Sequence, residues 1–110
     1  MAAVLVDSNV LLDILVRDPR WGVWSRSTVA ALANESILVI NPIIYAEVSV
    51  DFARIEDVDE SLPPDVFIRE PLPYEAGFLA GKCHRNYRLL TRNAPRFRSY
   101  FPTIQLIAPQ

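Results

Sequence analysis

Cysteine and histidine are almost absent from this chain, which has one of each among its 110 residues, at Cys83 and His84. A single cysteine excludes an internal disulfide. Two neighbouring side chains without further cysteine or histidine ligands also exclude a structural zinc site. The fold must therefore be held by its own core.

Long hydrophobic runs are also lacking. Runs such as Ile37–Ile40 are a few residues long, whereas a membrane-spanning helix needs about 18. Met1–Val6 leads straight into Asp7, without the basic and apolar regions of a secretory signal, so a cytoplasmic protein is expected. With 51% hydrophobic and 22% charged residues, the composition is typical of a folded protein, and the length suits a single domain over residues 1–110.

Charge is unevenly distributed along the chain. Residues 71–110 carry six basic side chains and one acidic one, whereas residues 56–70 carry one basic and six acidic. Aromatic residues lie between the basic ones, a combination that suits phosphates and stacked bases. A solvated helix face with arginine stems over apolar surface is the alternative. The candidate nucleic-acid-binding residues are Lys82, Arg85, Arg88, Arg92, Arg96 and Arg98.

Strand-like and helix-like patterns alternate, which predicts an α/β fold with three layers and a mostly parallel central sheet flanked by helices. Short apolar runs predict strands at Ala2–Val6, Ile37–Ile40, Val66–Ile68, Leu89–Thr91 and Ile104–Ile107. Helical spacing and turn residues predict helices at Val10–Leu15, Trp21–Ala33, Pro42–Arg54, Glu56–Glu60 and Pro73–Asn86. The last helix meets its strand at Tyr87–Arg88 with no glycine or proline between them, which is an unusually abrupt connection.

Two acids are placed to converge at one edge of this sheet. Asp7 follows the first strand, and Glu47 lies in the helix after the strand Ile37–Ile40. Ligands of parallel sheets bind beyond the carboxyl ends of the strands, and paired carboxylates there favour a hard cation such as Mg²⁺. Two alternatives remain open: Asp7 as a helix N-terminal residue, and Glu47 as part of a polar stripe with Asp51 and Arg54.

The other acids of this region and the one histidine are assigned no chemistry. Asp13 and Asp18 are expected to be exposed acids or to lie at a helix end. His84 has no recognisable nucleophile motif to act with.

Several stretches in chain order resemble PIN-domain proteins of the VapC toxin type. They are VLVDSNVLLD from Val4, INPIIYAE from Ile40, LAGK from Leu79, LLTRN from Leu89 and YFP from Tyr100. The resemblance implies a PIN-like fold, a homodimer, a cognate antitoxin partner and cleavage of RNA that depends on Mg²⁺ or Mn²⁺. By the same resemblance, Asp7 and Glu47 are the first two acids of the metal site.

The chain departs from the family at the remaining acids. The family's third acid opens a helix in a Pro-Asp-Phe-type segment, which is absent here, and the Tyr87–Arg88 junction stands in its place. Asn93 stands where the family often has aspartate, and its neutral oxygen is suited at most to positioning water. The chain is therefore either a shortened relative or one from whose sequence a segment has been lost.

Two functions from different classes follow. One is a metal-dependent endoribonuclease of the VapC-like toxin class, impaired by the loss of the third acid. The other is a non-catalytic PIN-like module that binds an antitoxin or RNA. A phosphatase with an aspartate nucleophile would want a second acid two residues after Asp7, where this chain has Asn9.

Overall fold

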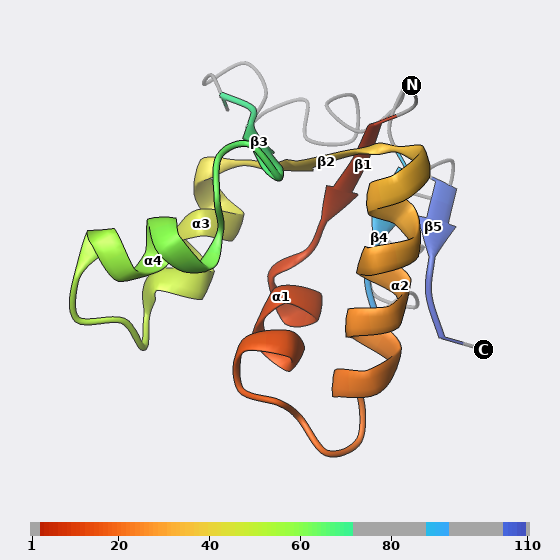
Figure 1. The fold of residues 1–110 in the computed structure, drawn as a ribbon, viewed down its shortest axis with the longest axis horizontal. Coiled ribbons are helices and arrows are strands. Elements are labelled where there is room, and N and C mark those ends of the chain that lie inside the picture. The colour runs from red at the N-terminus through yellow and green to blue at the C-terminus, as the bar shows by residue number, and fades with distance from the viewer. Residues whose placement is uncertain (1–2, 72–87, 93–104, 110) are drawn as a thin grey trace.

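The computed structural model describes residues 3–71, 88–92 and 105–109, and Figure 1 shows their arrangement. In chain order the described elements are β1 (Ala3–Val6), α1 (Ser8–Leu15), α2 (Gly22–Glu35), β2 (Ile37–Ile40), α3 (Pro42–Ser49), α4 (Ile55–Ser61), β3 (Phe67–Arg69), β4 (Arg88–Leu90) and β5 (Gln105–Ile107). None of these helices is long and apolar enough to cross a membrane. The predicted helix Pro73–Asn86, with Cys83 and His84, lies outside the described residues.

The described strands form one parallel sheet in the order β3-β2-β1-β4-β5. β1 lies at its centre, where Val4 is in register with Leu38 of β2 on one side and with Arg88 of β4 on the other. Because all the pairings are parallel, every one of these strands ends at the same edge. The predicted parallel sheet is confirmed, with β3 and β4 each shifted by one residue from the predicted positions.

Both faces of the central strands are buried. Leu38 borders a groove with residues of α1 and α2, and Ile40 borders a pocket with residues of α3 and α4, so the described helices cover the face to which both side chains point. Side chains alternate along a strand, so Leu5 and Val39 point to the opposite face, where they are only 4% and 3% exposed. The sheet is therefore an inner layer, as predicted.

The predicted start of α3 is confirmed. The Asn41 side chain accepts a hydrogen bond from the Ile44 amide at 2.9 Å, and Pro42 occupies the first turn. Asparagine satisfies a helix amide that has no partner inside the helix, and proline gives up an amide that would have had none. The sequence fixes this helix end by local chemistry alone.

The end of α3 differs from the prediction, because the helix stops at Ser49 and not at Arg54. The Ser49 hydroxyl donates to the Tyr45 carbonyl at 2.7 Å, a local bond that competes with helix continuation. The predicted stripe of Glu47, Asp51 and Arg54 on one helix is therefore wrong. Arg54 instead pairs with Glu56 on the surface, at 3.4 Å.

Asp13 is buried, which corrects the expectation that it would be exposed or lie at a helix end. It is 2% exposed, its carboxylate pairs with Arg92 at 2.9 Å, and it accepts a hydrogen bond from the Ser25 hydroxyl at 3.0 Å. A buried carboxylate needs such partners, because desolvation of an unpaired charge is costly. The three residues join α1, α2 and the segment after β4.

The connection from α1 to α2 is a tight turn. Arg17 has a φ of 53°, and the amides of Arg17 and Asp18 donate to the carbonyls of Ile14 and Asp13, which is the hydrogen-bond pattern of a Schellman motif. Glycine usually occupies this left-handed position, and another residue there costs roughly 1 kcal/mol. At Gly22, a Cβ would lie 3.3 Å from the Asp13 carbonyl oxygen, so glycine allows the two helices to approach closely.

Asp18 ties this turn to α2. Its carboxylate accepts hydrogen bonds at 2.8 Å from the amides of Trp21 and Arg20, and these bonds hold the pKa of Asp18 below its usual value. The carboxylate is thus turned toward the backbone at the start of α2.

The ion pair of buried Asp13 with the partly exposed Arg92 predicts a large effect of Arg92→Met, which removes the counterion but keeps a long side chain. We expect the free energy of unfolding to fall by about 3 kcal/mol, because an uncompensated carboxylate stays buried. Urea denaturation followed by circular dichroism measures the change. The double variant Asp13→Asn/Arg92→Met should recover part of the loss. A single-variant loss below about 0.5 kcal/mol, as at an ordinary surface site, would contradict the dependence of buried Asp13 on Arg92.

Candidate functional site

Polar residues follow four neighbouring strands at the carboxyl edge of the sheet. Asp7 follows β1, Asn41 follows β2, Glu70 follows β3 and Thr91 follows β4. The backbone pairing continues into these positions, since the amides of Asp7, Glu70 and Thr91 donate to Leu90, Ile40 and Ile107 respectively at 2.8–3.0 Å. The parallel register thus sets these residues in a row at one edge, where ligands of such sheets bind.

Asp7 occupies the central place in this row. It is the N-cap of α1, and its Oδ1 atom accepts a hydrogen bond from the Ser8 amide at 2.8 Å. Its Oδ2 atom accepts one from the hydroxyl of Thr91 at 3.1 Å, and Thr91 is fully buried. Helix N-termini favour negative charge. The carboxylate is thus held in one orientation from two sides.

Asn9 extends this arrangement. Its Nδ2 atom donates to the Thr91 hydroxyl oxygen at 3.2 Å. The hydroxyl has one proton, which it gives to Asp7, so it can receive this donation through a lone pair. The remaining Asn9 oxygen, Oδ1, is buried, and the described part of the chain provides no hydrogen-bond partner for it. An oxygen acceptor beside Asp7 and Thr91 is thus still available.

Glu47, the second predicted metal ligand, lies on the exposed side of α3, whose buried residues are Ile44 and Val48. α3 follows β2 and packs against α1, the helix that Asp7 caps. Within residues 3–71, 88–92 and 105–109, no three His, Cys, Asp or Glu side chains gather as a metal-binding group. Joint metal binding by Asp7 and Glu47 stays a prediction.

Two of the predicted nucleic-acid-binding residues are described, and both make contacts within the protein. Arg88 donates to the Ser36 hydroxyl at 3.0 Å, and Arg92 donates to Asp13. Reversal of Arg92 to glutamate would set a second carboxylate against the buried Asp13, so such a variant would report on folding rather than on binding. Asn93, Lys82, Arg85, Arg96 and Arg98 lie outside the described residues.

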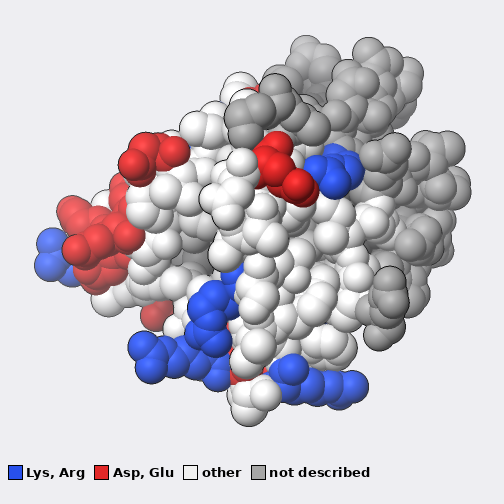
Figure 2. All heavy atoms as spheres, turned by 45° about the vertical axis from the view of Figure 1, so that its right-hand side comes forward, with Lys and Arg blue, Asp and Glu red and all other residues white. Residues whose placement is uncertain are grey.

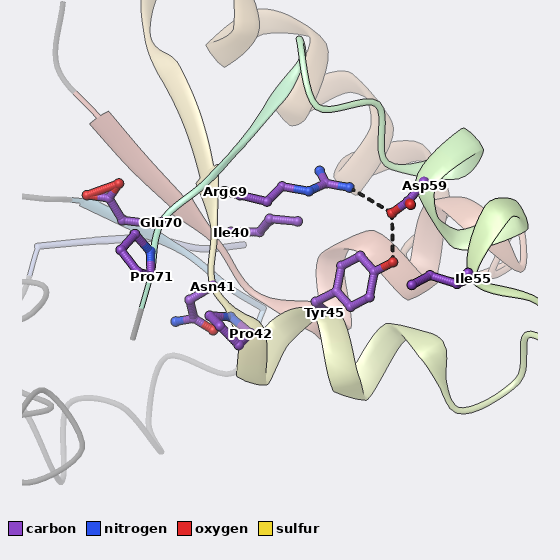
Figure 3. Close-up of a pocket in the computed structure, with 9 residues that line it drawn as sticks. All are labelled: Ile40, Asn41, Pro42, Tyr45, Ile55, Asp59, Arg69, Glu70 and Pro71. Carbon is purple, nitrogen blue, oxygen red and sulfur yellow. Dashed lines mark hydrogen bonds and ion pairs between the residues drawn. The ribbon is translucent and has the colours of Figure 1, made fainter. Parts of the chain in front are cut away.

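A pocket of about 490 Å³ lies beside this row, at the ends of β2 and β3 (Figure 3). Inside it the Tyr45 hydroxyl donates to Asp59 at 2.6 Å, and Arg69 donates to the same carboxylate oxygen at 3.2 Å. The Arg69 guanidinium also lies 5.5 Å from the centre of the Tyr45 ring. Sequence analysis missed this network, because its members come from α3, α4 and β3 and no spacing in the sequence relates them.

The network shifts the ionisation of its tyrosine. The hydrogen bond to Asp59 is the main cause that raises the pKa of Tyr45, and burial and the negative charge of Asp59 act in the same direction. Arg69 opposes the shift through its positive charge. Tyr45 is therefore a neutral hydrogen-bond donor well beyond physiological pH.

Comparison with known proteins identifies the fold. No protein-family model matches the chain, and no curated protein matches it significantly. Among solved structures, a chain in the crystal structure of VapBC2 from Rickettsia felis bound to a DNA fragment from their promoter aligns with a TM-score of 0.69. The alignment covers 98% of this chain and 99% of that chain at 14% identity. The likeness confirms the predicted three-layer, PIN-like α/β class. At this sequence identity it supports the fold alone.

The raised pKa of Tyr45 predicts a loss of stability in alkali. A raised folded-state pKa contributes stability below the unfolded value of 10.0, and the contribution disappears as pH rises through the folded pKa. The wild-type protein should therefore lose stability relative to Tyr45→Phe, which has no phenol to ionise, between about pH 8 and about pH 11. Urea denaturation at both pH values measures the difference. An equal gap between the two proteins at both values would contradict the assignment.

Proposed function

We propose that this chain is the toxin component of a toxin–antitoxin pair, a PIN-like endoribonuclease whose metal site is weakened. The observation that carries the proposal is the position of Asp7. It caps a helix at the carboxyl end of the central strand, and Ser8 and Thr91 orient its carboxylate. A carboxylate held in this way is suited to bind a cation at the edge where substrates of α/β folds bind.

The oxygen ligands of this edge fit a weakly held Mg²⁺ or Mn²⁺. The Asp7 Oδ2 atom accepts the hydrogen bond from Thr91 and keeps a further lone pair, whereas Oδ1 accepts from both the amide and the hydroxyl of Ser8. The buried Asn9 Oδ1 atom has no partner in the described part of the chain. We assign Asp7 and Glu47 to the ion and Asn93 to the positioning of water. A bound ion would offset charge on a phosphodiester and activate water for its hydrolysis. With two carboxylates, we expect the ion to keep most of its water and to bind weakly.

RNA binding rests on different residues. In this proposal the phosphates contact Lys82, Arg85, Arg88, Arg92, Arg96 and Arg98, whose positive charges need no metal. Arg92 contributes less than the sequence suggests, because Asp13 already neutralises it. Binding and cleavage are therefore separable in this chain.

The partners of the proposed toxin follow from the same likeness. The solved neighbour is a VapBC2 complex bound to promoter DNA, which supports a cognate antitoxin as a partner here. A mainly apolar groove of about 310 Å³ between α1, α2 and α4 is a surface on which such a partner can bury apolar side chains. A homodimer in the cytoplasm completes the proposal.

A second candidate function is a PIN-like module that binds RNA or an antitoxin without cleavage. It is favoured by one observation: within the described residues, no three His, Cys, Asp or Glu side chains form a metal-binding group. The two candidates share the fold and differ in whether Asp7 supports hydrolysis.

Cleavage of a mixed tRNA substrate tests the nuclease. We expect slow cleavage with Mg²⁺ or Mn²⁺ that Asp7→Asn abolishes, because asparagine still caps α1 but supplies no charge to a cation. Asp65→Asn, at an exposed acid before β3, is the matched control and should keep the activity. Cleavage unaffected by Asp7→Asn would contradict the proposal. Absence of cleavage, with RNA binding retained, would select the non-catalytic module.

A further inference from the structure

A basic, aromatic corner lies where α1 runs into α2. Its members are Arg17, Arg20 and Trp21, which we call the α1–α2 corner. Both arginines are exposed, and the Arg20 guanidinium lies 4.9 Å from the centre of the half-buried Trp21 ring. Figure 2 shows basic side chains gathered at the lower end of the molecule, the end that carries this connection in Figure 1. Acidic side chains gather on the side of α4, which begins with Glu56 and Asp57.

The corner is physically joined to the Asp7 edge. Thr91 donates to Asp7. The guanidinium of the next residue, Arg92, lies 6.0 Å from the centre of the Trp21 ring. α1 has eight residues, so Asp7 at its start and the corner at its end are separated by about 12 Å. A few nucleotides of single-stranded RNA can span that distance.

The backbone of Arg17 points to a use for its side chain. Its φ of 53° is a conformation that glycine adopts without penalty and that other residues rarely occupy. Arginine in this position lowers the stability of the fold, but it places a positive charge at the corner. Such a residue is a reasonable indicator of function when a charged patch surrounds it.

We propose that the α1–α2 corner binds single-stranded RNA that extends from the Asp7 edge. The proposal rests on the proposed function, and it assigns the corner to the path of that substrate. Arg17 and Arg20 contact phosphates, and Trp21 stacks on a base. Arg20 is exposed and can leave the ring for a phosphate, which frees that side of the ring.

Arg92 has a different part in this corner. Its guanidinium pairs with Asp13 and lies beside the Trp21 ring, so it contributes less to phosphate binding than Arg17 and Arg20 do. Charge counting along the sequence does not reveal this basic corner, because acids outnumber the basic residues in the first half of the chain. Only the fold separates Arg17 and Arg20 from the acidic side chains of α4.

Binding of a fluorescein-labelled, single-stranded RNA of twelve nucleotides, measured by anisotropy in EDTA, tests the proposal. We expect Arg17→Gly/Arg20→Gln to weaken binding about tenfold at low salt, and to reduce the slope of log affinity against log salt by about 1.4, the value for two lost phosphate contacts on a single strand. Arg54→Gly is the matched control, since it removes one exposed arginine beside acidic α4. It should bind RNA as the wild type does.

Stability provides an independent check on these variants. Arg17→Gly alone should unfold at the same or a higher urea concentration than the wild type, because glycine suits the left-handed position. It should nevertheless bind RNA more weakly. A loss of binding in a protein that is at least as stable cannot be explained by unfolding.

Tryptophan fluorescence locates the RNA. Trp21 and Trp24 are the only two tryptophans, so Trp24→Phe leaves Trp21 as the sole reporter. Saturating RNA should quench its emission, and Arg54→Gly in the same background should not alter the quenching. Unchanged Trp21 emission at saturation would overturn the proposal.

The remaining outcomes are equally decisive. The proposal would be overturned if Arg17→Gly/Arg20→Gln bound RNA with the affinity and salt slope of the wild type. It would also be overturned if a twelve-residue polyglutamate displaced the RNA at equal concentration, a result that would assign the corner to an acidic protein. Because EDTA removes metal-dependent cleavage from this assay, corner-dependent binding without any nuclease activity would support the corner while the endoribonuclease proposal failed.

Discussion

The ion pair between buried Asp13 and the partly exposed Arg92 is the interaction on which the rest of the described structure depends. It joins residues 79 positions apart, and a desolvated carboxylate leaves few alternatives to its arginine partner. Arg92 can reach Asp13 only when β4 lies beside β1, and this pairing sets Thr91 against Asp7. This charge pair thus links the last turn of α1 to the segment after β4, next to the β1–β4 pairing and the Thr91–Asp7 hydrogen bond.

The same pair explains how basic residues can collect near an acidic edge. Arg92 is neutralised inside the protein, so it supports the Trp21 ring without adding repulsion between neighbouring cations. Arg17 and Arg20 remain at the surface, while the acids of α4 lie on another side. A polyanion would therefore meet positive charge at the α1–α2 corner and negative charge along α4, which favours one direction of approach.

Local patterns predicted the elements well wherever one residue decides the outcome. The strand at Ile37–Ile40 and the helix start at Asn41–Pro42 follow from β-branched residues and capping chemistry, which act within a few positions. Asp13 was misassigned because its partner lies in a remote segment, although its place three residues after buried Val10 puts it on the same helix face. The Tyr45 network was missed for the same reason, since its contacts exist only after three elements have packed.

The fold and the proposed metal site depend on different properties of this chain. β4 begins at Arg88, within the abrupt Tyr87–Arg88 connection that the sequence predicted, yet it pairs with β1 on one side and β5 on the other. At β4 the sheet requires apolar side chains and backbone groups that can pair with the neighbouring strands. Leu90 supplies a fully buried apolar side chain. A metal site requires a sufficient number of carboxylates, which no packing interaction can replace. A chain of this fold with few acids at the sheet edge can therefore keep its architecture and the Thr91–Asp7 contact and still offer a cation only weak binding.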